Sequence, residues 1–430
     1  MKSKKTIKWI WIIVLGTATI VLMFLIYRKN YVECDIEEMF PDEEFREYVL
    51  QEFDADRDGT ISRSEADEVR EISVFLSEDN VHSLKGIEIF SNLETLTCES
   101  CNLEELDVSA NHKLVELNCG DNHLKQLNLQ ANRSLTSLGC IDNELTELDL
   151  SRCTELESLG CSGNRLTSLE LHFPHLQVLW CSENALSELD VADCPKLVGL
   201  SCSDNQIAML DFRKNEWIRI VECDNNRLEH LYLWNDDCED EDYRISSLSC
   251  DNNNLEELDL SSIRYLRSLS CKNNALTNLD VSRYEDLYSL DCSGNRLTEL
   301  NLSNNLTLVE LKCGNNPLNG LDISKNREIK SLEVNDLGLT ELDLTPFSNL
   351  YSLDCSGNKL TELQFGDNVK MQRLNCSDNR LTELEIVFST KVRAKRSLDC
   401  RGNNLTAVRM NIEPDTMECD DNVKVILPEE

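Results

Sequence analysis

Residues 54–65 carry oxygen-bearing groups at the spacing that a calcium-binding loop requires. Three carboxylates alternate at the start, a glycine permits a sharp turn and a glutamate closes the segment. Calcium takes about six to eight oxygen ligands, from carboxylates, hydroxyls and backbone carbonyls, directly or through water. The sequence therefore predicts a calcium site, and its predicted ligands belong to Asp54, Asp56, Asp58, Thr60, Ser62 and Glu65.

Two helical patterns flank this loop, so the segment resembles a single EF-hand. Phe45, Tyr48, Val49 and Phe53 have helical spacing before the loop, and a second helix is expected to run to about Ile72. EF-hand loops usually act in pairs, and the sequence contains no second loop. We therefore expect weak binding, with a Kd on the order of 10⁻⁴ to 10⁻³ M. The alternative is an acidic helical pair that covers the end of the following repeats without binding calcium.

Most of the remaining chain repeats the pattern L-x-C-x-x-N-x-L-x-x-L about every 21 residues. The cysteine position is filled by Cys98, Cys119, Cys140, Cys161, Cys181, Cys202, Cys223, Cys250, Cys271, Cys292, Cys313, Cys355, Cys376, Cys400 and Cys419. Val334 replaces one cysteine, Cys101 and Leu337 replace two asparagines, and Leu76 is expected in the cysteine position of a degenerate first turn. A fixed period of this length predicts a solenoid of stacked turns.

Each turn divides its residues between a buried strip and an exposed face. A leucine and the cysteine two residues later, such as Leu290 and Cys292, share one side of a short strand. The asparagine amide both donates and accepts, so we expect a hydrogen-bonded column of asparagines where the chain leaves each strand. A second polar column, which includes Asp149, Asp259 and Asp280, is expected to accept N–H bonds from its own turns, with collective cation binding as the alternative.

The repeats resemble those of bacterial leucine-rich repeat surface proteins, in the internalin-like form with short cysteine-containing repeats. The resemblance covers roughly residues 72–425. It implies a right-handed coil with a parallel β-sheet on its inner face and a role in binding rather than catalysis. The EF-hand-like segment is then expected to form a small helical cap at the end of the coil.

The cysteines are expected to be buried thiols rather than disulfides. Parallel side chains in neighbouring turns suit the disulfide dihedral poorly, and a buried free cysteine acts as a small apolar residue. Cys98 and Cys101 form a C-x-x-C pair without a second pair or a histidine nearby. We interpret them as one strand cysteine and one replacement in the asparagine column, with a zinc or redox pair as the alternative.

The first residues carry the signature of a membrane anchor. Residues 9–27 contain no charge and follow four lysines, which predicts one transmembrane helix with a cytoplasmic N-terminus. The predicted organisation is a cytoplasmic tail over 1–8, a signal-anchor over 9–27, a linker over 28–40, the cap over 41–71 and the solenoid over 72–430. The predicted location is therefore the plasma membrane, with a single crossing and extracellular repeats; removal of the segment as a signal peptide is the alternative.

The net charge of −37 argues against nucleic acid as a partner, because such binding needs a basic footprint. The six histidines show no catalytic pattern, and no nucleotide-binding motif is present. We therefore predict neither an enzyme nor a site for a small-molecule substrate.

One stretch of the exposed face is apolar. Trp180 lies in an outward position with Val178, and Ile220 and Glu222 occupy the same two outward columns. Exposed apolar patches with an aromatic anchor are typical of binding surfaces. We predict that these four residues contact a protein or a surface glycan; local packing of Trp180 over small neighbours is the alternative for the patch. For the whole chain, the alternative is a structural spacer without a specific ligand.

Overall fold

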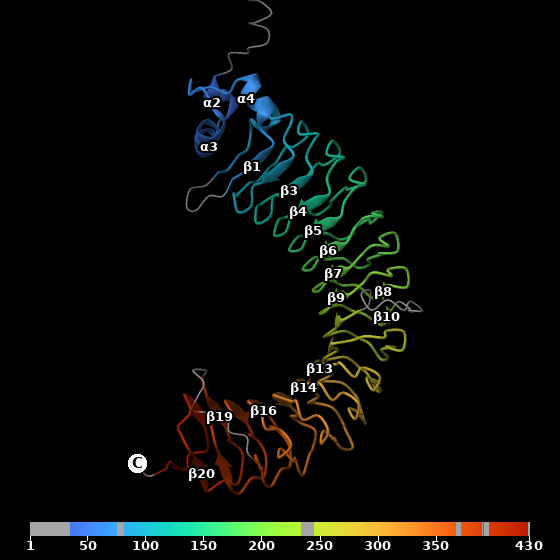
Figure 1. The fold of residues 1–430 in the computed structure, drawn as a ribbon, viewed down its shortest axis with the longest axis vertical. Helices are drawn as coiled ribbons and strands as arrows, with labels where there is room; N and C mark the ends of the chain where they lie inside the picture. Colours follow the sequence, from blue (N-terminus) through green and yellow to red (C-terminus); the bar gives the residue numbers. More distant parts are fainter. Residues whose placement is uncertain are drawn as a thin grey trace, which may run out of the picture. The chain divides into compact units, whose positions relative to one another are not determined.

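A computed structural model of the chain describes residues 35–74, 81–233, 245–366, 371–388, 390 and 395–428. The chain divides into two compact units, residues 1–155 and 156–430. In both units, short strands alternate with long turns (Figure 1).

The first unit begins with helices and continues with repeats. Its helices are α2 (Ile36–Met39), α3 (Glu43–Phe53) and α4 (Arg63–Glu68), with a 3₁₀ turn at Ile87–Ile89. Its parallel strands pair in chain order and are β1 (Glu71–Ser73), β2 (Thr95–Thr97), β3 (Glu116–Asn118) and β4 (Ser137–Gly139). Helix α2 lies inside the segment that the sequence predicted as a linker.

Helix α3 is fixed to the first turns by aromatic packing and by two hydrogen bonds. Phe40, Phe45 and Phe90 are fully buried, and the rings of Phe53 and Phe90 lie 5.6 Å apart. The Asp42 carboxylate caps α3 and also accepts the N–H groups of His82 at 2.8 Å and Ser83 at 3.1 Å. The helices therefore share a core with the start of the repeats.

Two details of the first turn differ from the sequence prediction. Helix α4 ends at Glu68, and Ile72 lies in strand β1, where it pairs with Leu96. This register places Val74 in the cysteine position, and its N–H donates to the Thr97 carbonyl at 2.8 Å. The prediction of Leu76 for that position is therefore wrong; Leu76 itself lies outside the described residues.

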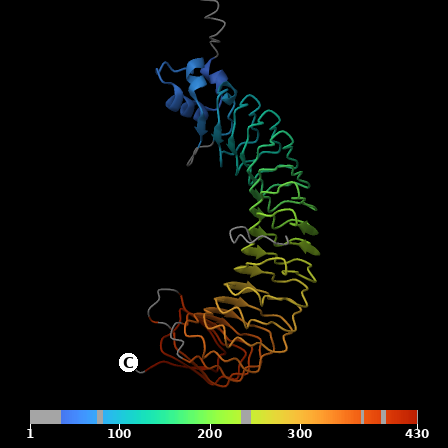
Figure 2. The ribbon, with the colours of Figure 1, turned by 45° about the vertical axis from the view of Figure 1, so that its right-hand side comes forward.

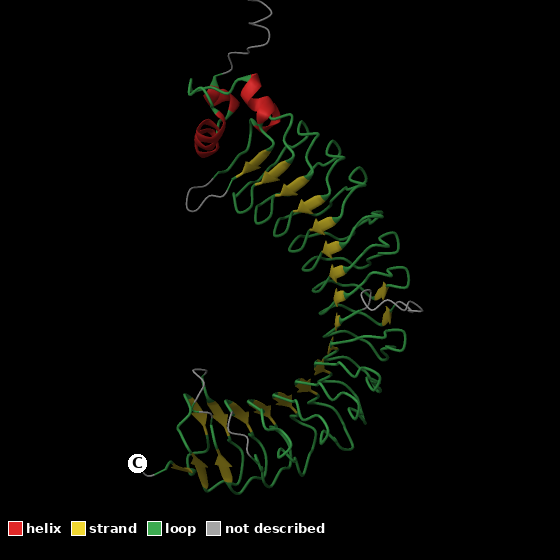
Figure 3. Cartoon of the chain, viewed as in Figure 1, coloured by secondary structure: helices red, strands yellow, loops and turns green. Residues whose placement is uncertain are grey.

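The second unit contains the longer part of the sheet, whose strands lie side by side along the inner side of its curve (Figures 2 and 3). These parallel strands are β5 (Ser158–Gly160), β6 (Val178–Trp180), β7 (Gly199–Ser201), β9 (Ile220–Glu222), β11 (Ser247–Ser249), β12 (Ser268–Ser270), β13 (Ser289–Asp291), β14 (Glu310–Lys312), β15 (Ser331–Glu333), β16 (Ser352–Asp354), β17 (Arg373–Asn375), β19 (Ser397–Asp399) and β21 (Thr416–Glu418). Two smaller parallel sheets contain β8 (Met209–Asp211) with β10 (His230–Tyr232), and β18 (Leu384–Ile386) with β20 (Ala407–Met410) and β22 (Lys424–Ile426).

The predicted buried strip is confirmed. Leu290 and Cys292 are fully buried, and Leu297, Leu300 and Leu302 fill the rest of the same turn. The described cysteines are free thiols, and all are buried except Cys419, which is half-buried. Stacked turns thus bury together an apolar strip that one turn could not cover alone.

The predicted asparagine column is also confirmed. The amide group of Asn295 donates to the carbonyls of Cys271 at 2.9 Å and Cys292 at 3.0 Å. Its oxygen accepts the Leu276 N–H at 3.1 Å, so one side chain pairs backbone groups of two successive turns. These bonds satisfy buried backbone groups that the short strands leave unpaired.

The predicted localisation requires correction. In the part of the chain that the structure describes, no helix has the length and apolar character needed to cross a membrane, and the longest, α3, has 11 residues. A single-pass plasma-membrane protein with extracellular repeats is therefore not supported. The predicted signal-anchor, residues 9–27, lies outside the described residues.

Candidate functional site

Neighbouring strands of the second unit bring the predicted contact residues onto one face. Strand register aligns Val178 with Gly199 and Gly199 with Ile220 in one outward row. In the other outward row, Trp180 is followed by Ser201 and then by Glu222. We call Val178, Trp180, Ile220 and Glu222 the Trp180 patch.

The Trp180 patch is open to solvent. Trp180 and Ile220 are each 47% exposed, Glu222 is exposed and Val178 is half-buried. Leu179, Leu200 and Val221 lie between the outward residues and are buried, so the exposed side chains stand on a packed strand backbone. Such a surface offers apolar contact area from Trp180, Val178 and Ile220 and one carboxylate, that of Glu222.

The outward residues of the following strands are different. Ser247, Ser268 and Ser289 continue the row of Val178 and Ile220. All three serines are half-buried. The exposed apolar area is therefore concentrated at strands β6 and β9 rather than spread along this row.

The predicted calcium loop joins α3 to α4. Carboxylate oxygens of Asp54, Asp56 and Asp58 all lie within 4.8 Å of one another. The hydrogen bond from the Asp58 backbone lowers the pKa of Asp56, but burial and the charges of Asp58, Glu65 and Asp54 outweigh it, so this pKa is raised. Three carboxylates at this separation repel one another, and a divalent cation would relieve the repulsion.

The other predicted ligands have a different arrangement. Glu65 accepts the N–H groups of Ala55 and Ser62, each at 2.8 Å, so its carboxylate ties the two ends of the loop together. Burial raises the pKa of Glu65, but these hydrogen bonds hold it below its usual value. The Thr60 hydroxyl donates to Asp58 at 2.7 Å. Asp54 likewise accepts the Gly59 N–H at 2.8 Å, so carboxylates at both ends of the loop already bond to loop N–H groups.

The C-x-x-C pair does not have the geometry of an exposed metal or redox site. Cys98 and Cys101 are both buried, and burial raises the pKa of Cys101 to about 11. The Cys101 thiol donates to the Val74 carbonyl at 3.7 Å. The Cys101 backbone N–H donates to the side-chain oxygen of Asn122. Cys101 thus takes over one donor role of the asparagine column, as the sequence indicated.

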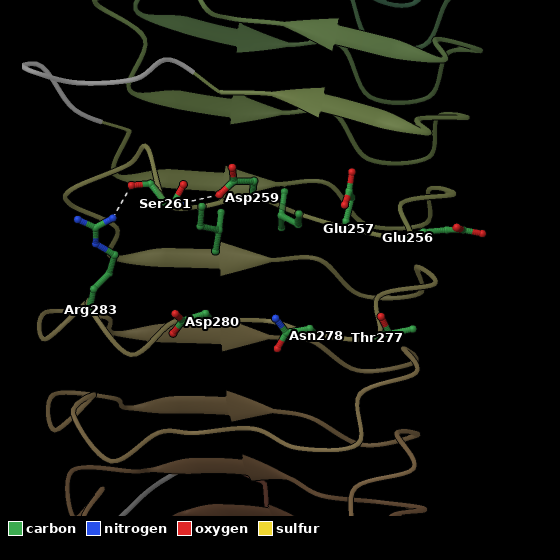
Figure 4. Close-up of a pocket in the computed structure, with 10 residues that line it drawn as sticks. Glu256, Glu257, Asp259, Ser261, Thr277, Asn278, Asp280 and Arg283 are labelled. Carbon is green, nitrogen blue, oxygen red and sulfur yellow. Dashed lines mark hydrogen bonds between the residues drawn. The ribbon is translucent and has the colours of Figure 1, made fainter.

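A hollow of about 420 Å³ lies between two successive turns of the second unit (Figure 4). Asp259 accepts the Ser261 N–H at 2.8 Å, and Arg283 from the next turn donates to the Ser261 carbonyl (Figure 4). The Ser261 hydroxyl and N–H also lower the pKa of Asp259. Here the predicted aspartate column caps its own turns, and the hollow is a groove between them.

Sequence reasoning missed a second buried column. Asn111, Asn132, Asn215, Asn305 and Asn326 are fully buried, and each donates to two carbonyls of the preceding turn. Tyr284 takes the same place and donates to the Leu260 carbonyl at 2.6 Å. The signal was present, because each of these residues follows a strand cysteine by 13 positions.

Solved structures of bacterial leucine-rich repeat proteins resemble this chain. The functional domain of InlJ from Listeria monocytogenes, described as including a cysteine ladder, has 30% sequence identity and a TM-score of 0.72. That match covers 81% of this chain and 76% of the InlJ domain. The stacked strand cysteines described above form the corresponding feature of this chain.

Two further structures share the fold at lower identity. The internalin InlF from Listeria monocytogenes has 20% identity and a TM-score of 0.61, over 78% of this chain and 96% of InlF. A leucine-rich repeat protein of Leptospira interrogans has 20% identity and a TM-score of 0.64, over 84% of this chain and 93% of that protein. No protein-family model and no curated protein matches the sequence.

Proposed function

Because the chain belongs to the internalin-like family of bacterial leucine-rich repeat proteins, we propose that it binds a protein partner through the Trp180 patch. The observation that carries this proposal is the exposure of Trp180 and Ile220 on the strand face. Exposed aromatic residues on a rigid support dominate many protein interfaces. The aliphatic side chains of Val178 and Ile220 favour a protein over a surface glycan, because they offer no hydrogen bond to sugar hydroxyls.

Substitution of Trp180 tests this proposal. We expect Trp180→Ala to weaken partner binding at least about tenfold, as loss of a hot-spot side chain does. Thermal unfolding should change little, because about half of the side chain is already exposed. Partners would be captured from extracts with the full-length chain, and their affinities measured by surface plasmon resonance.

A matched control is available in Trp217, which is 42% exposed and lies outside the described strands. Trp217→Ala should retain partner binding. Equal binding by the wild-type, Trp180→Ala and Trp217→Ala chains would reject the patch. A chain that captures no specific partner would favour the alternative of a structural spacer.

We also propose that the loop at residues 54–65 binds calcium and stabilises the helical cap. The support is the cluster of Asp54, Asp56 and Asp58, to which the Thr60 carbonyl, the Ser62 hydroxyl and Glu65 would add oxygen ligands. A bound ion would cancel the mutual repulsion of the carboxylates. Because α3 shares its core with Phe90, that gain should extend to the first repeats.

Calorimetry of the full-length chain with about millimolar calcium tests the loop. We expect a binding heat and a higher unfolding temperature for the first unit, and both should disappear in Asp56→Asn/Asp58→Asn. Asp121→Asn is a matched control, because Asp121 is an exposed aspartate on a turn in the same unit. If the wild-type chain gives no calcium-dependent heat, the helical cap acts without calcium.

A further inference from the structure

A single-residue gap lies inside the Trp180 patch. Gly199 separates Val178 from Ile220, so these two apolar side chains stand two strand spacings apart, about 10 Å. A Cβ atom added at Gly199 would meet no atom within 4 Å. By contrast, one added at Gly139, on the sheet face of the first unit, would lie 3.1 Å from the Asn118 oxygen.

The gap is therefore open space rather than a site filled by a neighbouring side chain. Its floor is the Gly199 backbone, its walls are Val178 and Ile220, and Trp180 stands in the adjacent outward row. We call this space the Gly199 socket. One side chain of leucine or methionine size would bury apolar surface on both walls. Each Å² of apolar surface buried contributes a favourable free energy of about 25 cal/mol.

Carboxylates lie along the β9 side of the socket. Glu222 is exposed on the same strand as Ile220. Asp224 follows and accepts the Ser249 hydroxyl and the Asp251 N–H, each at 2.7 Å. No ion pair with Glu222, Asp224 or Asp251 occurs among the residues that the structure describes.

Asp224 and Asp251 are close enough for their charges to interact, and Glu222 adds a third carboxylate on strand β9. The pKa of Asp251 is raised by burial and by the charges of Asp224 and Asp291. Arg219, three residues before Glu222, is half-buried and has an interaction of its own, whereas Arg227, three residues after Asp224, is exposed beyond the strand. The chain as a whole carries a net charge of −37, so its field favours a cationic partner.

From this juxtaposition we infer that the Gly199 socket receives one apolar side chain of a protein segment whose neighbouring lysine or arginine pairs with Glu222 and Asp224. The inference rests on the proposed protein-binding function and names the chemistry of its partner. The apolar side chain supplies contact area in the socket, and the basic side chain gives orientation along the sheet face.

A random peptide library displayed on phage is the probe, selected on the full-length chain. We expect enriched peptides to combine an aliphatic or methionine residue with lysine or arginine a few positions away. Synthetic peptides of the enriched sequences would then be measured against the wild-type chain and its variants by fluorescence anisotropy at low and high salt.

Gly199→Leu fills the socket from within, and we expect it to weaken binding roughly tenfold or more. Gly320→Leu is the matched control, because a Cβ at Gly320 also meets nothing within 4 Å but lies on an exposed turn away from the strands. Glu222→Gln/Asp224→Asn should weaken binding roughly three- to tenfold and reduce its salt dependence. Circular dichroism confirms that each variant is folded.

The outcomes separate the two proposals. If Trp180→Ala abolishes binding but Gly199→Leu and the charge variant do not, the proposed function stands and the socket inference fails. Enrichment of acidic peptides, or peptides that bind every variant equally, also overturns the inference. If selection enriches no peptide that binds the wild-type chain, the socket does not recognise a linear segment and the inference is rejected.

Discussion

Raising the pH from 7 to 10 is expected to unfold the repeats by ionising their thiols. Fourteen strand cysteines, from Cys98 to Cys400, are fully buried in the described structure. Burial raises the pKa of Cys161 to about 12, whereas that of an unfolded cysteine is about 8.5. The folded state thus binds protons more tightly, and stability is fully present below about pH 8.5 and is lost as the pH rises toward the folded value.

The size of the effect follows from these two pKa values. At pH 10 an unfolded thiol gains about 2 kcal/mol from ionisation that a buried thiol does not. Even a few such thiols therefore offset the stability of an ordinary domain, about 5–15 kcal/mol. Since repeats can unfold in sections, loss of structure is expected well before every thiol ionises.

The assay is urea unfolding followed by circular dichroism between pH 7 and 10, in a phosphine reductant that prevents oxidation. Val334 shows that valine fits the cysteine position, because it is fully buried there. Cys292→Val/Cys313→Val should therefore fold at pH 7. Between pH 7 and 10 its free energy of unfolding should fall by about 4 kcal/mol less than that of the wild-type chain. Identical pH dependence of the two proteins, or rapid alkylation of folded wild-type thiols at pH 7, would refute the reasoning.

Two further predictions concern polar columns. Asn295→Ala leaves the Leu276 N–H and the Cys271 carbonyl without their side-chain partner, so chemical denaturation should show a loss of about 2–5 kcal/mol. Asn278→Ala, at an exposed position of the preceding turn, is the control and should cost far less. Asp280 has a pKa lowered by the Ser282 hydroxyl and N–H, so its contribution to stability is present above about pH 4 and is lost as the pH falls through the folded value. Asp280→Asn should flatten this acid loss in melting experiments at pH 3 and 6 while keeping the turn, since Asn301 caps the equivalent turn at 3.1 Å; an unchanged acid dependence would contradict this.

The buried strip could be predicted from the sequence because its residues repeat. Leu290, Cys292 and Asn295 recur at fixed spacing, and the Asn295 amide bonds to carbonyls of its own turn and of the preceding turn. The first turn could not be placed in the same way. Val74 and Leu76 are both apolar and two residues apart, so a strand pattern of period two fits either of them. Pairing of β1 with β2 decides between them, and helix α3 contacts β1 where the Tyr48 hydroxyl accepts the Ser73 N–H at 3.1 Å.

Some features of the candidate site could also be predicted from the repeat, and others could not. The outward positions of Trp180 and Ile220 followed from the period alone. The open space at Gly199 did not, because it depends on what the neighbouring turns place above a backbone atom. For the calcium loop, the spacing of the three aspartates predicted their proximity, but it gave no sign that Glu65 would bond to the loop backbone.

If the chain binds a partner as proposed, the outward rows can vary to distinguish one partner from another. Inward residues must pack against the turns on both sides, so the buried positions carry nearly the same residue types in every turn. Outward residues carry no such constraint, and serine occupies one row at Ser247, Ser268, Ser289, Ser331 and Ser352. Stacking therefore does not require valine, glycine and isoleucine at the aligned positions of β6, β7 and β9. Because serine can fill this row, the exposed apolar groups at β6 and β9 support the proposed contact with a partner.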